Sequence, residues 1–212
     1  MSTPEIFPRL AASLMRARSE RDRIDSARRQ QLDALVRSIN ERIDADSEAR
    51  LIFICTHNSR RSHLSQLWAQ AAAIWNGRHD IACFSGGTET TAFNPSAVQA
   101  LRNAGFEIET ATHDTNPRYD VRYAVSSAPL VAFSKKYDHA SNPSDGFIAV
   151  MTCSQADDGC PVVLGAAQRI SLPYGDPKEA DGTPLEAAVY EERSRQIARE
   201  MVYVMDALAS NG

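Results

Sequence analysis

The densest group of chemically useful side chains is the segment Cys55-Thr56-His57-Asn58-Ser59-Arg60-Arg61-Ser62. It follows the apolar run Leu51-Ile-Phe-Ile54 and precedes a stretch with helical spacing of apolar residues. A thiol at the carboxyl end of a buried parallel strand lies where open α/β sheets bind their ligands. A loop this short must curl, so its backbone N–H groups turn inward toward an anion, and the following helix adds unpaired donors. The segment therefore predicts a cysteine nucleophile beneath a tetrahedral oxyanion.

Two side chains at the end of the loop would assist the thiol. Arg61 can hold two oxyanion oxygens with its planar guanidinium, and its charge favours the thiolate of Cys55. Ser62 is placed to hydrogen-bond the sulfur. The alternative is a core thiol followed by solvated arginines, but the strand before the loop and the helix after it favour catalysis. The predicted oxyanion-binding residues are Thr56, His57, Asn58, Ser59, Arg60 and Arg61.

The elements that must hold this loop alternate between strand and helix from residue 51 onward. Short apolar runs predict buried strands at 51–54, 81–84, 147–151 and 169–172. Asn94-Pro95 is typical of a helix start, and Pro184 begins a long final helix. The alternation predicts a three-layer α/β fold with a central parallel sheet of about four strands and helices on both faces.

The first 49 residues form a predicted helical arm, and residues 50–212 form the catalytic domain. A shorter helix is expected near Pro8, and a longer helix carries an apolar stripe. The stripe consists of Leu32, Leu35, Val36, Ile39 and Ile43. A striped helix in water requires a second surface. The arm therefore either packs on the main body or forms a homodimer.

Composition excludes several functional classes. The 212 residues carry a net charge of −4, with a pI of about 5.7, which gives no support to binding nucleic acid or an anionic membrane. No apolar stretch is long enough to span a membrane, and the first residues lack the pattern of a secretory signal. Four cysteines in such a chain indicate a reducing compartment, so we expect a cytoplasmic protein.

The loop resembles the Cys-(x)5-Arg-Ser signature of low-molecular-weight protein tyrosine phosphatases and of the arsenate reductases built on the same fold. Further matches are Ser85-Gly-Gly87, Asn94-Pro95 and Asp176-Pro177, so the resemblance covers most of the chain but not the arm. It implies that Asp176 is the general acid that protonates the leaving oxygen. Without the resemblance, the stretch from Gly175 to Lys178 is also ordinary turn sequence.

Two loop positions depart from the pattern of that family. His57 stands where those enzymes commonly carry glycine, and Arg60 stands where they carry a small residue or cysteine. A non-glycine residue in a tight loop costs strain or alters the anion-binding nest. Both side chains could deepen the anion pocket or point outward. Asp176 lacks the following aromatic residue that stacks a phenol in tyrosine phosphatases, which favours a small inorganic substrate.

The pair Cys153 and Cys160 resembles the second and third cysteines of thioredoxin-linked arsenate reductases. The resemblance implies that Cys55 attacks arsenate, that Cys153 releases arsenite by forming a disulfide with Cys55, and that Cys160 resolves this disulfide. A thioredoxin-like reductant then regenerates the thiols. Core thiols or a zinc site are alternatives for the pair, although a zinc site lacks further ligands nearby. Cys83, within an apolar run, is assigned to core packing.

The sequence therefore predicts a thiol-dependent arsenate reductase that needs no cofactor or metal. The alternatives are a phosphatase that uses Cys55, Arg61 and Asp176, and a non-catalytic anion-binding module recruited through the arm. Within the poorly predicted segment 116–143, residues 122–125 and 130–133 could be extended. This segment could be a flap over the site or a subunit contact, and it receives no catalytic role.

Overall fold

Four parallel strands form the central sheet, in the order β2-β1-β6-β7. They are β1 (Ala49–Cys55), β2 (Ile81–Gly87), β6 (Phe147–Met151) and β7 (Ala166–Ser171). The computed structural model describes residues 5–159 and 162–209. In it β1 pairs with β2 from Ala49 to Cys55 and with β6 from Leu51 to Ile54, so β1 lies inside the sheet. The prediction of a parallel four-stranded sheet is confirmed.

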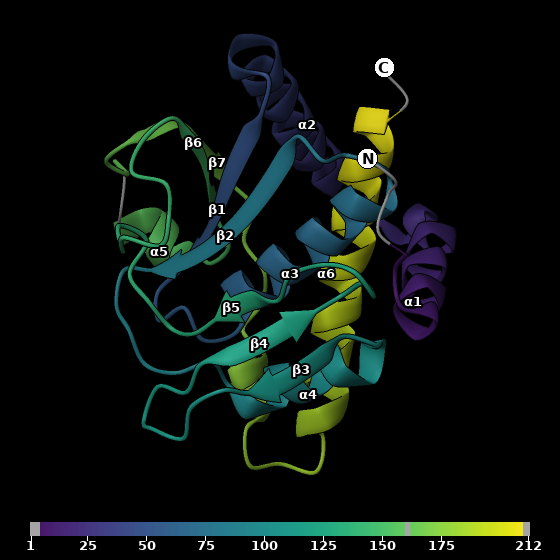
Figure 1. Cartoon of the computed structure of the whole chain (residues 1–212), viewed down its shortest axis with the longest axis vertical. Helices are drawn as coiled ribbons and strands as arrows, with labels where there is room; N and C mark the ends of the chain where they lie inside the picture. Colours follow the sequence, from purple (N-terminus) through teal and green to yellow (C-terminus); the bar gives the residue numbers. More distant parts are fainter. Residues whose placement is uncertain (1–4, 160–161, 210–212) are drawn as a thin grey trace.

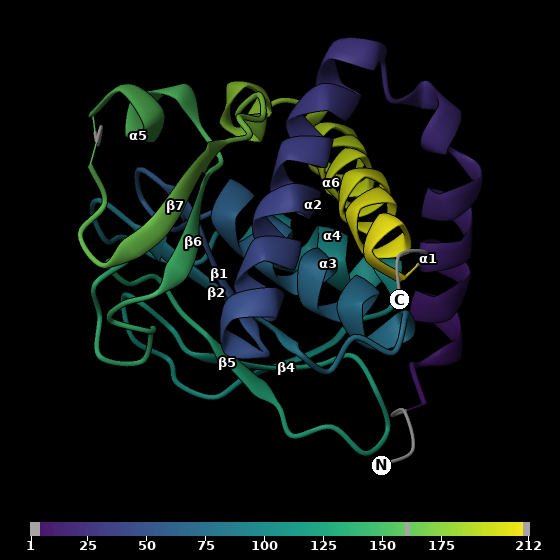
Figure 2. The ribbon, with the colours of Figure 1, turned by 90° about the horizontal axis from the view of Figure 1, so that it is seen from above.

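Helices lie on both faces of this sheet, as predicted (Figures 1 and 2). The long helices α2 (Ser26–Asp46), α3 (Arg61–Trp75) and α6 (Glu186–Ala209) form one layer. Beneath them, Leu51 and Phe53 belong to the main hydrophobic core. The neighbouring residues Ile52 and Ile54 point to the opposite face and pack in a smaller cluster with α5 (Ser154–Gly159). The loop between β1 and α3, residues 56–60, therefore starts from a strand that is buried on both faces.

A second sheet was not predicted from the sequence. It is antiparallel, with the order β3-β4-β5, and comprises β3 (Glu107–Thr110), β4 (Tyr119–Arg122) and β5 (Leu130–Ala132). The expected extended stretch at 122–125 is wrong in position, because β4 ends at Arg122. The stretch at 130–133 agrees with β5 to within one residue. The helix α4 (Pro95–Ala104) leads into β3, and Asn94 caps α4 as the sequence indicated.

The arm packs against the body of the same chain. Its helices are α1 (Pro8–Ser19) and α2, and they lie beside α6 (Figure 2). Their buried leucines Leu10, Leu14, Leu32 and Leu35 join the same core as the central sheet. The apolar stripe of α2 is thus covered by the body of the same chain. The boundary between residues 49 and 50 and the homodimer stay predictions.

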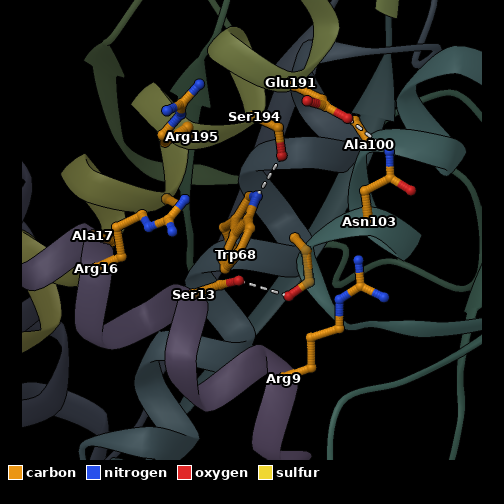
Figure 3. A pocket seen from close by; sticks show the side chains of 12 residues that line it. Arg9, Ser13, Arg16, Ala17, Trp68, Ala100, Asn103, Glu191, Ser194 and Arg195 are labelled. Carbon is orange, nitrogen blue, oxygen red and sulfur yellow. Dashed lines mark hydrogen bonds between the residues drawn. The ribbon is translucent and has the colours of Figure 1, made fainter. Parts of the chain in front are cut away.

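A cavity of about 500 Å³ lies where α1 meets α3, α4 and α6 (Figure 3). The indole of Trp68 stands at its centre and donates from Nε1 to Ser194 Oγ at 2.9 Å. Ser13 of α1 donates to the carbonyl of Ala104 at 2.8 Å, which ties the arm to the end of α4. No helix among the described residues is both long and apolar enough to cross a membrane.

Candidate active site

Cys55 is the last residue of β1, and its side chain is buried under the loop that follows. Its Sγ lies 3.1 Å from Ser62 Oγ in the first turn of α3. Asn58 Nδ2 donates to the same Ser62 oxygen at 2.8 Å. Because that oxygen already accepts a hydrogen bond, the Ser62 hydroxyl proton is free to point at the sulfur. The structure thus places the Ser62 hydroxyl within hydrogen-bond distance of the sulfur, where the sequence analysis expected it.

The loop is braced from behind by the chain around residue 135. Asn58 has a φ of 45°, in the left-handed region that asparagine tolerates, and its Oδ1 accepts from Lys135 N at 2.9 Å. Ser134 Oγ donates to the His57 carbonyl at 2.8 Å. A Cβ atom on Gly87 would lie 2.7 Å from the Thr56 carbonyl and 2.8 Å from the Asn58 nitrogen. Glycine at 87 therefore lets the end of β2 contact the loop backbone.

Arg61 and Asp176 meet at the mouth of the loop. Arg61 Nη2 donates to Asp176 Oδ2 at 2.6 Å, and Nη1 donates to the Tyr174 carbonyl at 3.1 Å. Arg61 Nε is buried and has no hydrogen-bond partner among the described residues. Asp176 precedes the 3₁₀ helix η2 (Pro177–Ala180), where its Oδ1 accepts from Lys178 N at 3.1 Å. The structure therefore brings the thiol, a guanidinium with a free donor and a carboxyl group to one site.

The side chains of His57 and Arg60 are engaged outside the loop. Arg60 donates to the Tyr190 hydroxyl at 2.7 Å and to Asp181 Oδ2 at 3.0 Å. His57 is partly exposed, and its Nε2 lies 3.5 Å from the carboxylate of Glu89. The strain expected from a non-glycine at His57 is not found there, because the only described loop residue with positive φ is Asn58. Oxyanion binding by this loop stays a prediction. It concerns mainly the backbone N–H groups of Thr56, His57, Asn58, Ser59 and Arg60.

One buried histidine behind the loop was missed by sequence reasoning. His63 is fully buried in α3, its ring stacks on Phe93 with centroids 4.0 Å apart, and its Nδ1 lies 3.2 Å from Ser85 Oγ. Burial lowers the pKa of His63 well below its usual value, and the nearby charge of Lys135 lowers it further. The imidazole is therefore neutral at pH 7. Its position four residues before the apolar Leu67, on the same face of the helix, was the available signal for burial.

The second predicted thiol lies next to the catalytic loop. Cys153 follows β6, the strand beside β1, and its Sγ is 3.5 Å from Thr56 Oγ1. The Sγ atom also accepts from Ala156 N at 3.4 Å, and Cys55 and Cys153 share the smaller hydrophobic cluster. Both are free thiols. Cys160 lies outside the described residues.

Cys83 is buried within β2, and burial raises the pKa of its thiol, consistent with core packing.

These features agree with the class of enzyme that the loop motif indicated, an oxyanion-directed enzyme with the low-molecular-weight phosphatase fold. No family model matches the chain. An arsenate reductase from Bacillus licheniformis is 29% identical over 159 residues, which cover 74% of this chain and 94% of that protein. An arsenate reductase from Bacillus subtilis is 28% identical over 147 residues, covering 68% of this chain and 86% of its own length.

The fold also matches a solved structure. A low-molecular-weight phosphotyrosine phosphatase from Vibrio cholerae superimposes with a TM-score of 0.51 and 15% sequence identity, covering 77% of this chain and 99% of that one. This chain therefore has the low-molecular-weight phosphatase fold and arsenate reductases among its sequence relatives. The resemblance stated from the loop motif is confirmed, and so is the expectation that the protein is an enzyme of this class.

Proposed function

We propose that this enzyme reduces arsenate to arsenite by successive reactions of three thiols. The observation that carries the proposal is the buried Cys153, whose Sγ lies 3.5 Å from the hydroxyl of the residue after the nucleophile. A phosphatase needs one thiol and water, and gives no reason for a second thiol beside the loop. The sequence relatives, which are arsenate reductases, support the same choice.

The first step forms a covalent adduct on Cys55. Arsenate binds to the loop N–H groups and to the guanidinium of Arg61, which has a buried Nε donor without a partner among the described residues. The Cys55 thiolate attacks arsenic, one As–O bond breaks, and the hydroxyl leaves as water with a proton from Asp176. Asp176 lies near the reacting atoms, because its Oδ2 is 2.6 Å from Nη2 of Arg61, the side chain that would hold the oxyanion. In this scheme the incoming arsenate replaces Asp176 on the guanidinium, and the released carboxyl group takes up from solvent the proton that it then donates.

The second step reduces arsenic. The Cys153 thiolate attacks Cys55 Sγ, an S–S bond forms and the S–As bond breaks, so that its electron pair remains on arsenic and arsenite leaves after protonation. Cys160 then attacks Cys153 Sγ, which frees the Cys55 thiolate and leaves a disulfide between Cys153 and Cys160. A thioredoxin-like dithiol reduces that disulfide. This cycle requires a reducing compartment, so we place the protein in the cytoplasm.

The test separates this relay from ester hydrolysis. Cys153→Ser is expected to lower arsenite production, driven by thioredoxin, thioredoxin reductase and NADPH, by at least about 100-fold, because the arsenic adduct then lacks its attacking thiol. The matched control is Cys83→Ser, which removes another buried thiol that lies within β2. Mass spectrometry after one turnover with arsenate should find a disulfide between Cys153 and Cys160 in the wild type.

Two outcomes would contradict the proposal. Steady hydrolysis of an aryl phosphate without arsenite formation, unaffected by loss of Cys153 and Cys160, would identify a phosphatase. Oxyanion binding with neither activity would identify a non-catalytic module.

A further inference from the structure

A second cavity, of about 360 Å³, lies behind the catalytic loop and contains a buried lysine. It is bounded by Cys83 and Phe84 of β2, by β5, and by the segment 133–142, and none of the loop residues 55–62 lines it. Lys135 lines this cavity with only 5% of its surface exposed. Lysine side chains are seldom buried to this degree without a partner of opposite charge. The cavity therefore differs from an ordinary surface hollow.

Lys135 Nζ has no hydrogen bond or ion pair with any described residue. The ring of Phe133 lies beside it, with the ring centroid 5.0 Å from Nζ, and the same centroid lies 4.7 Å from Arg118 Cζ. Burial lowers the pKa of Lys135 to about 8, and no carboxylate counteracts this effect. An ammonium ion in such a place is stabilised by an anion that enters the cavity.

The lining residues divide into a cationic group and an apolar group. The charged or chargeable members are Arg118, Lys135 and His139, and no aspartate or glutamate is among the residues that line the cavity. The apolar members are Phe84, Leu130, Val131 and Phe133. Val131 is 48% exposed at the edge strand β5, so the apolar wall reaches the surface. A ligand that fits both groups carries a negative charge and an apolar body.

We propose that this cavity binds a small organic carboxylate, with its anionic group on Lys135 and its apolar body against Phe133. The volume is within the range of small-molecule sites. The site is connected to the catalytic loop, because the backbone N–H of Lys135 donates to Asn58 and the Lys135 carbonyl accepts from Gly87 N at 2.8 Å. The proposal does not depend on the arsenate chemistry and holds equally for a phosphatase.

The chain offers a direct test, since it contains only three lysines, Lys135, Lys136 and Lys178. Protein labelled with [ε-¹³C]lysine gives three NMR signals, and Lys135→Met identifies the one that titrates near pH 8. Benzoate is the probe. Its carboxylate should raise the pKa of Lys135 by about one unit in a saturable manner, because an adjacent negative charge favours the ammonium form. The signals of Lys136 and Lys178 serve as internal controls.

Two further ligands and two variants decide the outcome. Benzyl alcohol, which lacks the charge, and acetate, which lacks the apolar body, should each bind at least about tenfold more weakly than benzoate.

Val131→Glu places a negative charge at the exposed mouth of the cavity and should weaken benzoate binding at least fivefold. Val125→Glu, at a 63% exposed position that does not line the cavity, should not. The proposal is overturned if benzoate gives no saturable shift, if acetate or inorganic phosphate acts as strongly as benzoate, or if all three lysines respond alike.

Discussion

The two thiol-bearing strand ends of the central sheet are built differently. After β1, the loop that follows Cys55 is fixed by hydrogen bonds from Asn58 and Ser134 and leads into the 15-residue helix α3. After β6, Cys153 is followed by the six-residue helix α5, and the chain beyond it exposes two large apolar side chains, Val162 and Leu164. The first strand end therefore leads into a long helix, and the second leads into a short helix that Asp157 ties to β7 through Ser171 and Arg169.

The difference matches the two kinds of chemistry. Oxyanion binding gains most from donors that are already in place before the reaction. A disulfide between Cys153 and Cys160 instead requires Cα atoms about 4.4–6.8 Å apart. A regular six-residue helix such as α5 rises about 9 Å, so the proposed disulfide requires α5 to unwind. The proposed relay therefore needs a fixed loop at Cys55 and a short helix at Cys153 that unwinds and releases Asp157 from β7.

The largest effect is expected at the strand end that leads into α3. Arg61→Lys keeps the positive charge but loses the planar fork that binds Asp176 and would bind the oxyanion. We expect kcat/KM for arsenate to fall by about 10²-fold or more, as for loss of one transition-state donor. Steady-state kinetics measure this. Near-normal kinetics would show that charge alone suffices and that the loop geometry is less demanding than the structure indicates.

A smaller loss is expected from a substitution beneath the loop. Gly87→Ala places a Cβ atom 2.4 Å from the Glu89 carbonyl and within 2.8 Å of loop backbone, so the loop must shift. Unfolding free energy should fall by about 1–3 kcal/mol, as for overpacking in a core, and alkylation of Cys55 by iodoacetamide should lose its protection by bound arsenate. Thermal denaturation and alkylation kinetics measure both. The control is Gly159→Ala in α5, where a Cβ atom meets nothing within 4 Å.

Gly159→Ala also gives the smallest predicted effect, at the strand end that leads into α5. Alanine stabilises a helix over glycine by up to about 1 kcal/mol, which makes unwinding of α5 harder. Formation of the disulfide between Cys153 and Cys160 should slow by up to about fivefold in a quenched single turnover, with no change in the first step at Cys55. Gln155→Gly, at an exposed position of α5, should accelerate it. Equal rates in both variants would show that α5 does not limit the relay.

Much of the site was predictable from the sequence because its signals are local. The run from Leu51 to Ser62 contains the strand, the nucleophile and the first turn of the helix within twelve consecutive residues. Asn94 and Pro95 marked the start of α4 for the same reason. Asp176 is distant in sequence, and only the resemblance to a known family indicated a role for it as general acid; its contact with Arg61 was not predicted.

The remaining features depend on contacts between distant segments. Three of the four residues in β3 are exposed, so this strand lacks the apolar alternation that indicates a strand. The burial of Lys135 follows from the packing of the 133–142 segment over β2, which no local pattern of charged residues predicts. From the sequence alone, the side chain of Arg60 could equally have faced the anion. Its bonds to Asp181 and Tyr190 arise from the chain beyond η2 and from α6.

The way the first helix is attached limits how far the chain can be shortened. Phe7 N donates to the Tyr123 carbonyl at 3.1 Å, and Leu10 and Leu14 are completely enclosed by the body. Removing residues before 26 would uncover apolar surface on α4 and α6 and leave the end of β4 without this bond. A minimal version of the enzyme therefore has to retain α1, even though the chemistry begins at residue 55.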